Sequence, residues 1–80
     1  MLQWDDAFEE CIRRSLPALS ASDPLAPDTD LQAFGLDSLA VIGITVEIES
    51  IYQITVPDEA VDFATFGTPA AIWLMIQQQR

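Results

Sequence analysis

Few side chains in this sequence could do chemistry. The 80 residues contain no histidine, and the three cationic residues are all arginine. A serine or cysteine nucleophile activated by an imidazole or a lysine amine is therefore excluded, as are zinc sites built on histidine and cysteine. Cys11 is the single cysteine, and at helical spacing we interpret it as a small core residue. We expect a protein that is not an enzyme.

Acidic residues are abundant, with thirteen against three arginines and a formal net charge of -10. Carboxylate pairs arise by chance at this density, and we interpret them as solvated surface. Asp28 could begin a calcium loop, but Ala33 and Leu39 stand where an EF-hand needs glycine and glutamate, so no metal site is expected. The charge argues against nucleic acid and anionic membranes as partners. Two roles remain for the negative charge: it keeps the protein soluble, and it steers the protein toward enzymes with basic docking patches.

One serine stands out because of its neighbours, in the run Gly35-Leu36-Asp37-Ser38-Leu39. Glycine permits a sharp turn, and Asp37 or Ser38 can cap a helix that follows. A serine at a helix N-terminus is exposed to free backbone N–H groups, which favour an anion such as a phosphodiester. Without their context, these residues are better explained by a Ser38 that only caps a helix.

The elements before this motif are a helix and a long connection. Periodicity predicts the helix from Met1 to about Leu19, with Pro17 compatible with its end. Its apolar stripe consists of Trp4, Phe8, Cys11, Ile12, Leu16 and Leu19. The connection from Ser20 to Asp37 is rich in turn formers, and Thr29 and Gln32 have the spacing of a capping box at a short helical turn. Its expected anchors to the core are Leu25, Leu31 and Phe34.

The segment from Ser38 to Tyr52 fits two patterns. Alternating β-branched residues allow an exposed strand, whereas a stripe at ~100° per residue allows a helix, which its length slightly favours. The helical stripe consists of Val41, Ile44, Thr45, Ile48, Ile51 and Tyr52.

The last third of the chain predicts a short helix and a longer one. A helix start at Pro57 leaves room for a turn or two before Asp62, and Phe63 and Phe66 flank another connection. Thr68-Pro69 predicts an N-cap followed by proline at the first helical position. The core side of this last helix consists of Ile72, Trp73, Met75 and Ile76.

Within this layout, the motif GLDSL resembles the attachment signature of the acyl carrier protein family. The resemblance runs from about Trp4 to Ile76. Its further marks are Asp30-Leu31, Leu39, the acidic end of the next helix at 47–52, Val56-Pro57-Asp58-Glu59 and Phe66-x-Thr68. It implies an all-α four-helix bundle of acyl-carrier type, with three main helices, one short helix and a long loop between the first two main helices. Residues 1–80 would form a single phosphopantetheine-binding carrier domain, with a helix after Ser38.

The resemblance also implies a function, in which 4′-phosphopantetheine from coenzyme A is attached to Ser38, with Asp37 as the flanking motif residue. The thiol of the arm would hold acyl intermediates as thioesters at high effective concentration. The implied partners are a phosphopantetheinyl transferase, an acyltransferase or acyl-activating ligase, and a ketosynthase or other tailoring enzymes. The start of the chain lacks the features of a signal peptide, so a discrete cytoplasmic monomer is expected. The alternative is an acidic helical interaction module that is never modified.

A second face of the helix after Ser38 predicts where partners dock. Leu39, Ile42, Val46 and Glu49 lie at i, i+3, i+7 and i+10, away from the core stripe. We expect docking through this face, since an exposed apolar patch commonly marks an interaction site. An acidic rim is expected from Glu47, Glu49, Asp58 and Glu59. The alternative is that the apolar side chains contact the long loop.

Two positions bear on the type of carrier. Gly43 stands where many fatty-acid carriers place an acid, which favours apolar recognition and argues against a fatty-acid carrier. Leu36 stands where peptidyl carriers often have a second glycine. The expectation is therefore a carrier of polyketide type or of other specialised metabolism, with a peptidyl or aminoacyl carrier as the alternative.

Overall fold

The computed structural model describes residues 4–80, and these are all helical or irregular, with no strand among them. The helices are α1 (Asp6–Ser15), α2 (Ser38–Tyr52), α3 (Phe63–Phe66) and α4 (Pro69–Gln79). Two single 3-10 turns join them, η1 (Leu31–Phe34) and η2 (Asp58–Ala60). The all-α prediction, with three main helices and one short helix, is confirmed.

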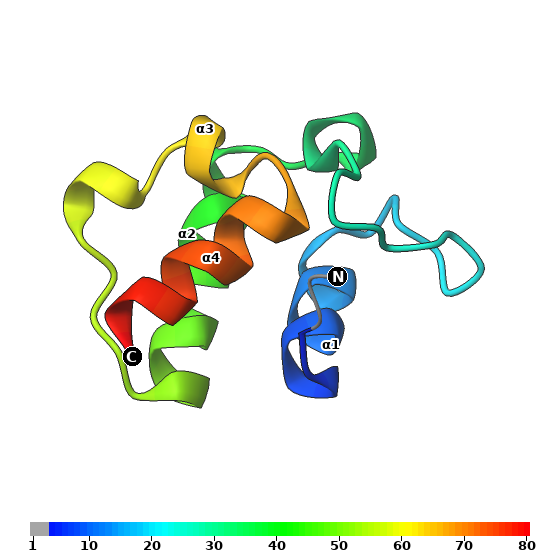
Figure 1. Ribbon diagram of the computed structural model, residues 1–80. Coiled ribbons are helices and arrows are strands. Elements are labelled where there is room, and N and C mark those ends of the chain that lie inside the picture. Colours follow the sequence, from blue (N-terminus) through cyan, green and yellow to red (C-terminus); the bar gives the residue numbers. More distant parts are fainter. Residues whose placement is uncertain (1–3) are drawn as a thin grey trace.

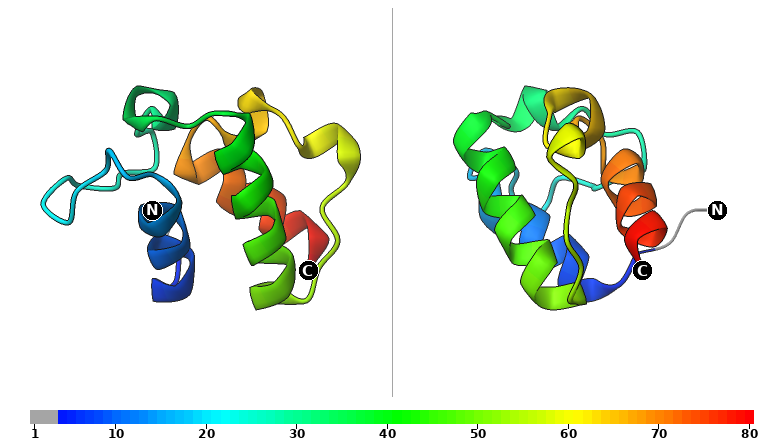
Figure 2. Two further views of the ribbon diagram at one scale, coloured as in Figure 1. Left: turned by 180° about the vertical axis from the view of Figure 1, so that it is seen from behind. Right: turned by 90° about the vertical axis from the view of Figure 1, so that its left-hand side faces the viewer.

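The three long helices pack side by side around one core, and α3 lies across one end (Figure 1). α1 packs against α2, and α3 packs against α4. The views in Figure 2 place η1, α3 and the first turn of α2 together at the same end of the bundle, with the chain's C-terminus at the other end. The site that begins at Ser38 is therefore built where three connections meet.

The core is apolar throughout and draws on every helix. Its buried residues are Phe8, Cys11, Ile12, Leu16, Leu19, Leu31, Leu36, Val41, Ile44, Ile48, Val56, Phe66, Ile72, Trp73, Met75 and Ile76. An aromatic chain ties α1 to α4, with ring centroids 5.2 Å apart between Phe8 and Trp73 and 5.6 Å apart between Trp4 and Phe8. Trp73 also meets the edge of Tyr52 at the end of α2, at 5.9 Å. Offset and edge contacts of this kind are favourable beyond the area they bury.

The first helix is shorter than the sequence predicts. Asp5 caps it, since its side chain accepts a hydrogen bond from the Phe8 amide at 2.9 Å, so the helix begins at Asp6. Met1 to Gln3 lie outside the described residues. At the other end Leu16 leaves the helix for an extended conformation, as expected for a residue that precedes proline. Leu16 and Leu19 remain in the core without being helical.

Two local predictions are wrong. Asp30, not Thr29, caps η1, by accepting from the Gln32 amide at 3.1 Å. The short helix is α3, where a connection was expected, because the Asp62 side chain caps it by accepting from the Thr65 amide at 2.7 Å. The predicted helix start at Pro57 is present as a single 3-10 turn, η2.

Helix α2 follows the helical alternative over its full predicted length. Val41, Ile44 and Ile48 are buried, and Thr45 and Tyr52 are half-buried. Ile51 belongs to the predicted core stripe but is 39% exposed, because the core covers α2 only along the line of the three buried residues. The helix ends at Gln53, which adopts a left-handed conformation with φ 55°.

Candidate functional site

Ser38 is the first residue of α2, and its side chain is exposed. The cap is Asp37: its carboxylate accepts from the Ala40 amide at 2.8 Å, and its carbonyl accepts from the Val41 amide at 2.9 Å. Within residues 4–80 the Ser38 hydroxyl takes part in no hydrogen bond. The hypothesis that Ser38 serves only as the helix cap is therefore wrong, and the hydroxyl is available for chemistry.

The chain approaches Ser38 through a turn that is fastened to the core. Gly35 adopts φ 99°, a backbone conformation that is strained for residues other than glycine. Leu36 is buried, and its amide donates to the Leu31 carbonyl at 3.1 Å. The Leu31 amide in turn donates to the carbonyl of Gly67 at 2.9 Å, which ties η1 to the turn between α3 and α4. Ser38 thus stands on a rigid support although it follows a long loop.

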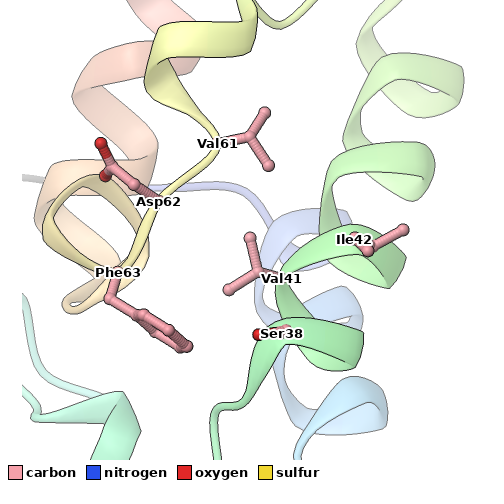
Figure 3. A pocket seen from close by; sticks show the side chains of 6 residues that line it. All are labelled: Ser38, Val41, Ile42, Val61, Asp62 and Phe63. Carbon is pink, nitrogen blue, oxygen red and sulfur yellow. The ribbon is translucent and has the colours of Figure 1, made fainter.

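An apolar hollow of about 190 Å³ opens beside the hydroxyl, between α2 and the segment that leads into α3. It is lined by Ser38, Val41, Ile42, Val61, Asp62 and Phe63 (Figure 3). The figure shows Val61 directed toward Val41 and the Phe63 ring directed toward the Ser38 end of α2. The Asp62 carboxylate points away from the hollow, which agrees with its role as the cap of α3.

Phe63 and Val61 are site residues that the sequence analysis missed. Phe63 is 41% exposed, so it contributes an aromatic surface to the site rather than to the core. The available signal was the pair Asp62 and Thr65, whose three-residue spacing suits a helix cap; it would have placed Phe63 at the start of a helix, but not against α2.

Comparison with known proteins decides what this site belongs to. Residues 6–73 match the model of a family described as "Phosphopantetheine attachment site". The chain belongs to this family. The matched range contains α1, α2, α3 and the first turns of α4, together with Ser38 and the hollow beside it.

Curated relatives carry the same kind of function in their names. The chain is 33% identical to a D-alanyl carrier protein of Listeria innocua over 69 residues, which cover 82% of this chain and 88% of the relative. A D-alanyl carrier protein of Listeria monocytogenes is 32% identical over the same shares of both chains. The protein is thus a non-catalytic carrier, and carriers of this family hold a covalently attached 4′-phosphopantetheine. Their partners are a phosphopantetheinyl transferase and ligases or acyltransferases.

The residues of this carrier suit such an arm. Ser38 is an exposed hydroxyl at the N-terminus of the 15-residue α2, where the helix dipole and free amides favour a phosphodiester. The adjoining hollow offers apolar walls from Val41, Val61 and Phe63. The fold needs neither the Ser38 hydroxyl, because Asp37 caps the helix, nor the Phe63 ring, which lies outside the core, whereas Val41 serves both the core and the hollow.

The predicted docking face of the carrier is open to solvent. Leu39 is 78% exposed, Ile42 is 54% exposed and Val46 is 60% exposed. Such fractions are too large for side chains packed under the long loop. They form an apolar stripe that starts beside Ser38 and runs along the outside of α2.

The four acids predicted as a rim lie in different environments. Glu47 faces α1, where it accepts from Arg14 at 2.6 Å, from the Cys11 thiol at 3.3 Å and from the Ser15 hydroxyl at 3.4 Å. Glu49 accepts from the Val56 amide at 2.9 Å and so fastens the end of α2 to the following segment. Asp58 and Glu59 are exposed in η2. Two of the four acids therefore hold the fold.

The contacts of Glu47 shift the pKa values of two groups. The hydrogen bond from Arg14 is the main cause that lowers the pKa of the Glu47 carboxyl. Burial, and then the neighbouring carboxylate, raises the pKa of the Cys11 thiol to about 12. Cys11 is fully buried and protonated at neutral pH, so the expectation of a core cysteine is confirmed.

Two further features bear on ligands and membranes. Among residues 4–80 no three acidic or cysteine side chains gather closely enough to hold a metal ion. No helix in that range has the length and apolar character required to cross a membrane.

Proposed function

We propose that this carrier bears its 4′-phosphopantetheine on the Oγ atom of Ser38. The observation that carries the proposal is the division of roles at the start of α2. Asp37 caps the helix, which leaves the Ser38 hydroxyl exposed beside an apolar hollow. The position lies within the range matched by the family, 6–73.

The attachment would be a phosphoryl transfer from coenzyme A. A bond forms between Ser38 Oγ and the phosphorus of the phosphopantetheinyl group, the bond from that phosphorus to adenosine 3′,5′-bisphosphate breaks, and the hydroxyl proton passes to a base on the transferase. The first turn of α2 stabilises the resulting phosphodiester through its dipole and free amides. When bound, the group supplies a terminal thiol that holds cargo as a thioester.

The test is the intact mass of the protein after incubation with coenzyme A and a broad-specificity phosphopantetheinyl transferase. The wild-type chain should gain the mass of one phosphopantetheinyl group, and Ser38→Ala should gain none. Ser50→Ala is the matched control, because Ser50 is another exposed serine of α2. An unmodified interaction module would show no gain in any chain, and an equal gain in Ser38→Ala would place the arm elsewhere.

For the cargo, the first candidate is an aminoacyl group. It is supported by the relatives, which are named as carriers of a D-alanyl group. The second candidate is an acyl group of polyketide type, favoured by Leu36 in place of a second glycine. The structure gives Leu36 a role in packing, since it is 6% exposed, which weakens its value as a sign of cargo. The mass of the group attached to the protein isolated from its native host would decide between the two.

Partner enzymes are proposed to dock on the outer face of α2, through Leu39, Ile42 and Val46. Exposure beside Ser38 supports this, since a partner on the face reaches the arm directly. Glu49, Asp58 and Glu59 would contribute charge at its edge, and Glu47 would contribute less because Arg14 neutralises it.

A further inference from the structure

Gly43 lies in the middle of α2, where the fold has no need of a glycine. Glycine destabilises a helix interior relative to alanine, because it loses more conformational freedom on folding. Apart from its chain neighbours and the backbone of its own helix, a Cβ atom added to Gly43 would meet no atom within 4 Å. Neither a close approach of another element nor an unusual backbone conformation explains the residue. No packing contact within the fold therefore requires the small size of Gly43.

A groove of about 320 Å³ lies at this position, on the flank of α2 opposite the hollow of Figure 3. Leu39, Ala40 and Gly43 form its α2 side, and Ser15, Pro17 and Gly35 form much of the remainder. A larger side chain at Gly43 would project into this space instead of into the core. The absence of a side chain at residue 43 therefore leaves this part of the groove open.

The charges around the groove indicate what it accepts. Its one charged lining residue is Asp37, at the end nearest Ser38, and no charged residue occurs from Ser38 to Val46. Arg14, on the nearby helix α1, is paired with Glu47 at 2.6 Å. An apolar side chain with a cationic neighbour at the Asp37 end is complementary to this surface, whereas an acidic group is not.

We propose that the groove receives an apolar side chain of the phosphopantetheinyl transferase that modifies Ser38. The inference rests on the proposed function of Ser38. Asp37 and Leu39 line the groove and are the direct neighbours of Ser38, so a molecule seated there lies beside the hydroxyl. Later enzymes can bind the arm, but the transferase meets the carrier before an arm exists and must recognise the protein surface alone.

The test measures kcat/KM for modification by a broad-specificity transferase, followed by intact mass. Gly43→Leu should fill the groove and lower kcat/KM about tenfold, mainly by raising KM, as expected for one apolar side chain that no longer buries. Gly43→Ala should cause a smaller loss while raising the urea midpoint of unfolding. Ser50→Leu is the matched control, because it adds the same side chain on the exposed side of α2, about two turns farther from Ser38 and outside the groove.

Modification of Gly43→Leu at the wild-type rate would overturn the groove as a recognition site. An equal loss in Ser50→Leu would also overturn it, because the effect would then come from any added apolar surface on α2. If Gly43→Leu loses helical circular dichroism, Gly43→Ala decides: slower modification of this better-folded variant supports the inference, and an unchanged rate refutes it. If the wild-type protein itself is not modified, the assignment of Ser38 is refuted, and this inference is refuted with it.

Discussion

Replacing Glu47 by alanine should loosen the contact between α1 and α2. The ion pair with Arg14 joins side chains that are 34% and 58% exposed, so it contributes at most about 1 kcal/mol. The bonds from Cys11 and Ser15 are long, at 3.3 and 3.4 Å, and add a fraction of this. We therefore expect Glu47→Ala to cost about 1 kcal/mol. With a urea m-value of about 1 kcal/mol/M, the midpoint falls by roughly 1 M.

Urea unfolding followed by circular dichroism measures this change, with Glu10→Ala as control because Glu10 is an exposed glutamate of α1. The pKa of Glu47 is lowered in the folded protein, so its contribution is complete above the unfolded pKa of about 4.3 and disappears as pH falls through the folded pKa. The difference between wild type and Glu47→Ala should thus shrink below about pH 4. Equal midpoints for Glu47→Ala and Glu10→Ala at pH 7 would refute the reasoning.

Three other changes test separate parts of the structure. Val46→Asp should leave the urea midpoint nearly unchanged, because the side chain is 60% exposed, but should slow transfer from a cognate enzyme; unfolding would show that Val46 is core. Gly67→Ala should destabilise the fold by about 1–3 kcal/mol in thermal melting, since its Cβ would lie 2.8 Å from the Phe63 carbonyl oxygen; an unchanged melting point would contradict this. The buried Cys11 thiol, with a pKa of about 12, should react with a thiol reagent only after unfolding in urea; rapid labelling of the native protein would be inconsistent with that burial.

The sequence predicted those parts of the fold that depend on local pattern. The bounds of α2, the cap and proline at Thr68-Pro69 and the core side of α4 are confirmed, because each depends on residues within one or two turns. The choice between Asp37 and Ser38 as the cap stayed open, since both residue types suit the role and only the backbone geometry separates them.

The remaining features depend on contacts between distant segments. The sequence pattern predicts that Glu47 is an exposed acid of α2. Its bond to Arg14 could not be predicted, because it joins residues 33 positions apart. The hollow beside Ser38 likewise requires Val61 and Phe63 to fold back against α2, which no periodicity indicates. Periodicity describes one face of one helix, whereas these features depend on how two segments are placed relative to each other.

The capping of α2 by Asp37 determines how modification of Ser38 would affect the stability of the domain. A serine that both capped the helix and received the arm would lose its capping hydrogen bond on modification. Folding and modification would then be linked, because each addition of the arm would lower the stability of the domain. With the cap on the neighbouring carboxylate, the hydroxyl contributes no contact to the native state that modification could remove. With the proposed attachment at Ser38, adding the arm would remove no native hydrogen bond, and any change in the unfolding equilibrium would come from contacts of the arm itself.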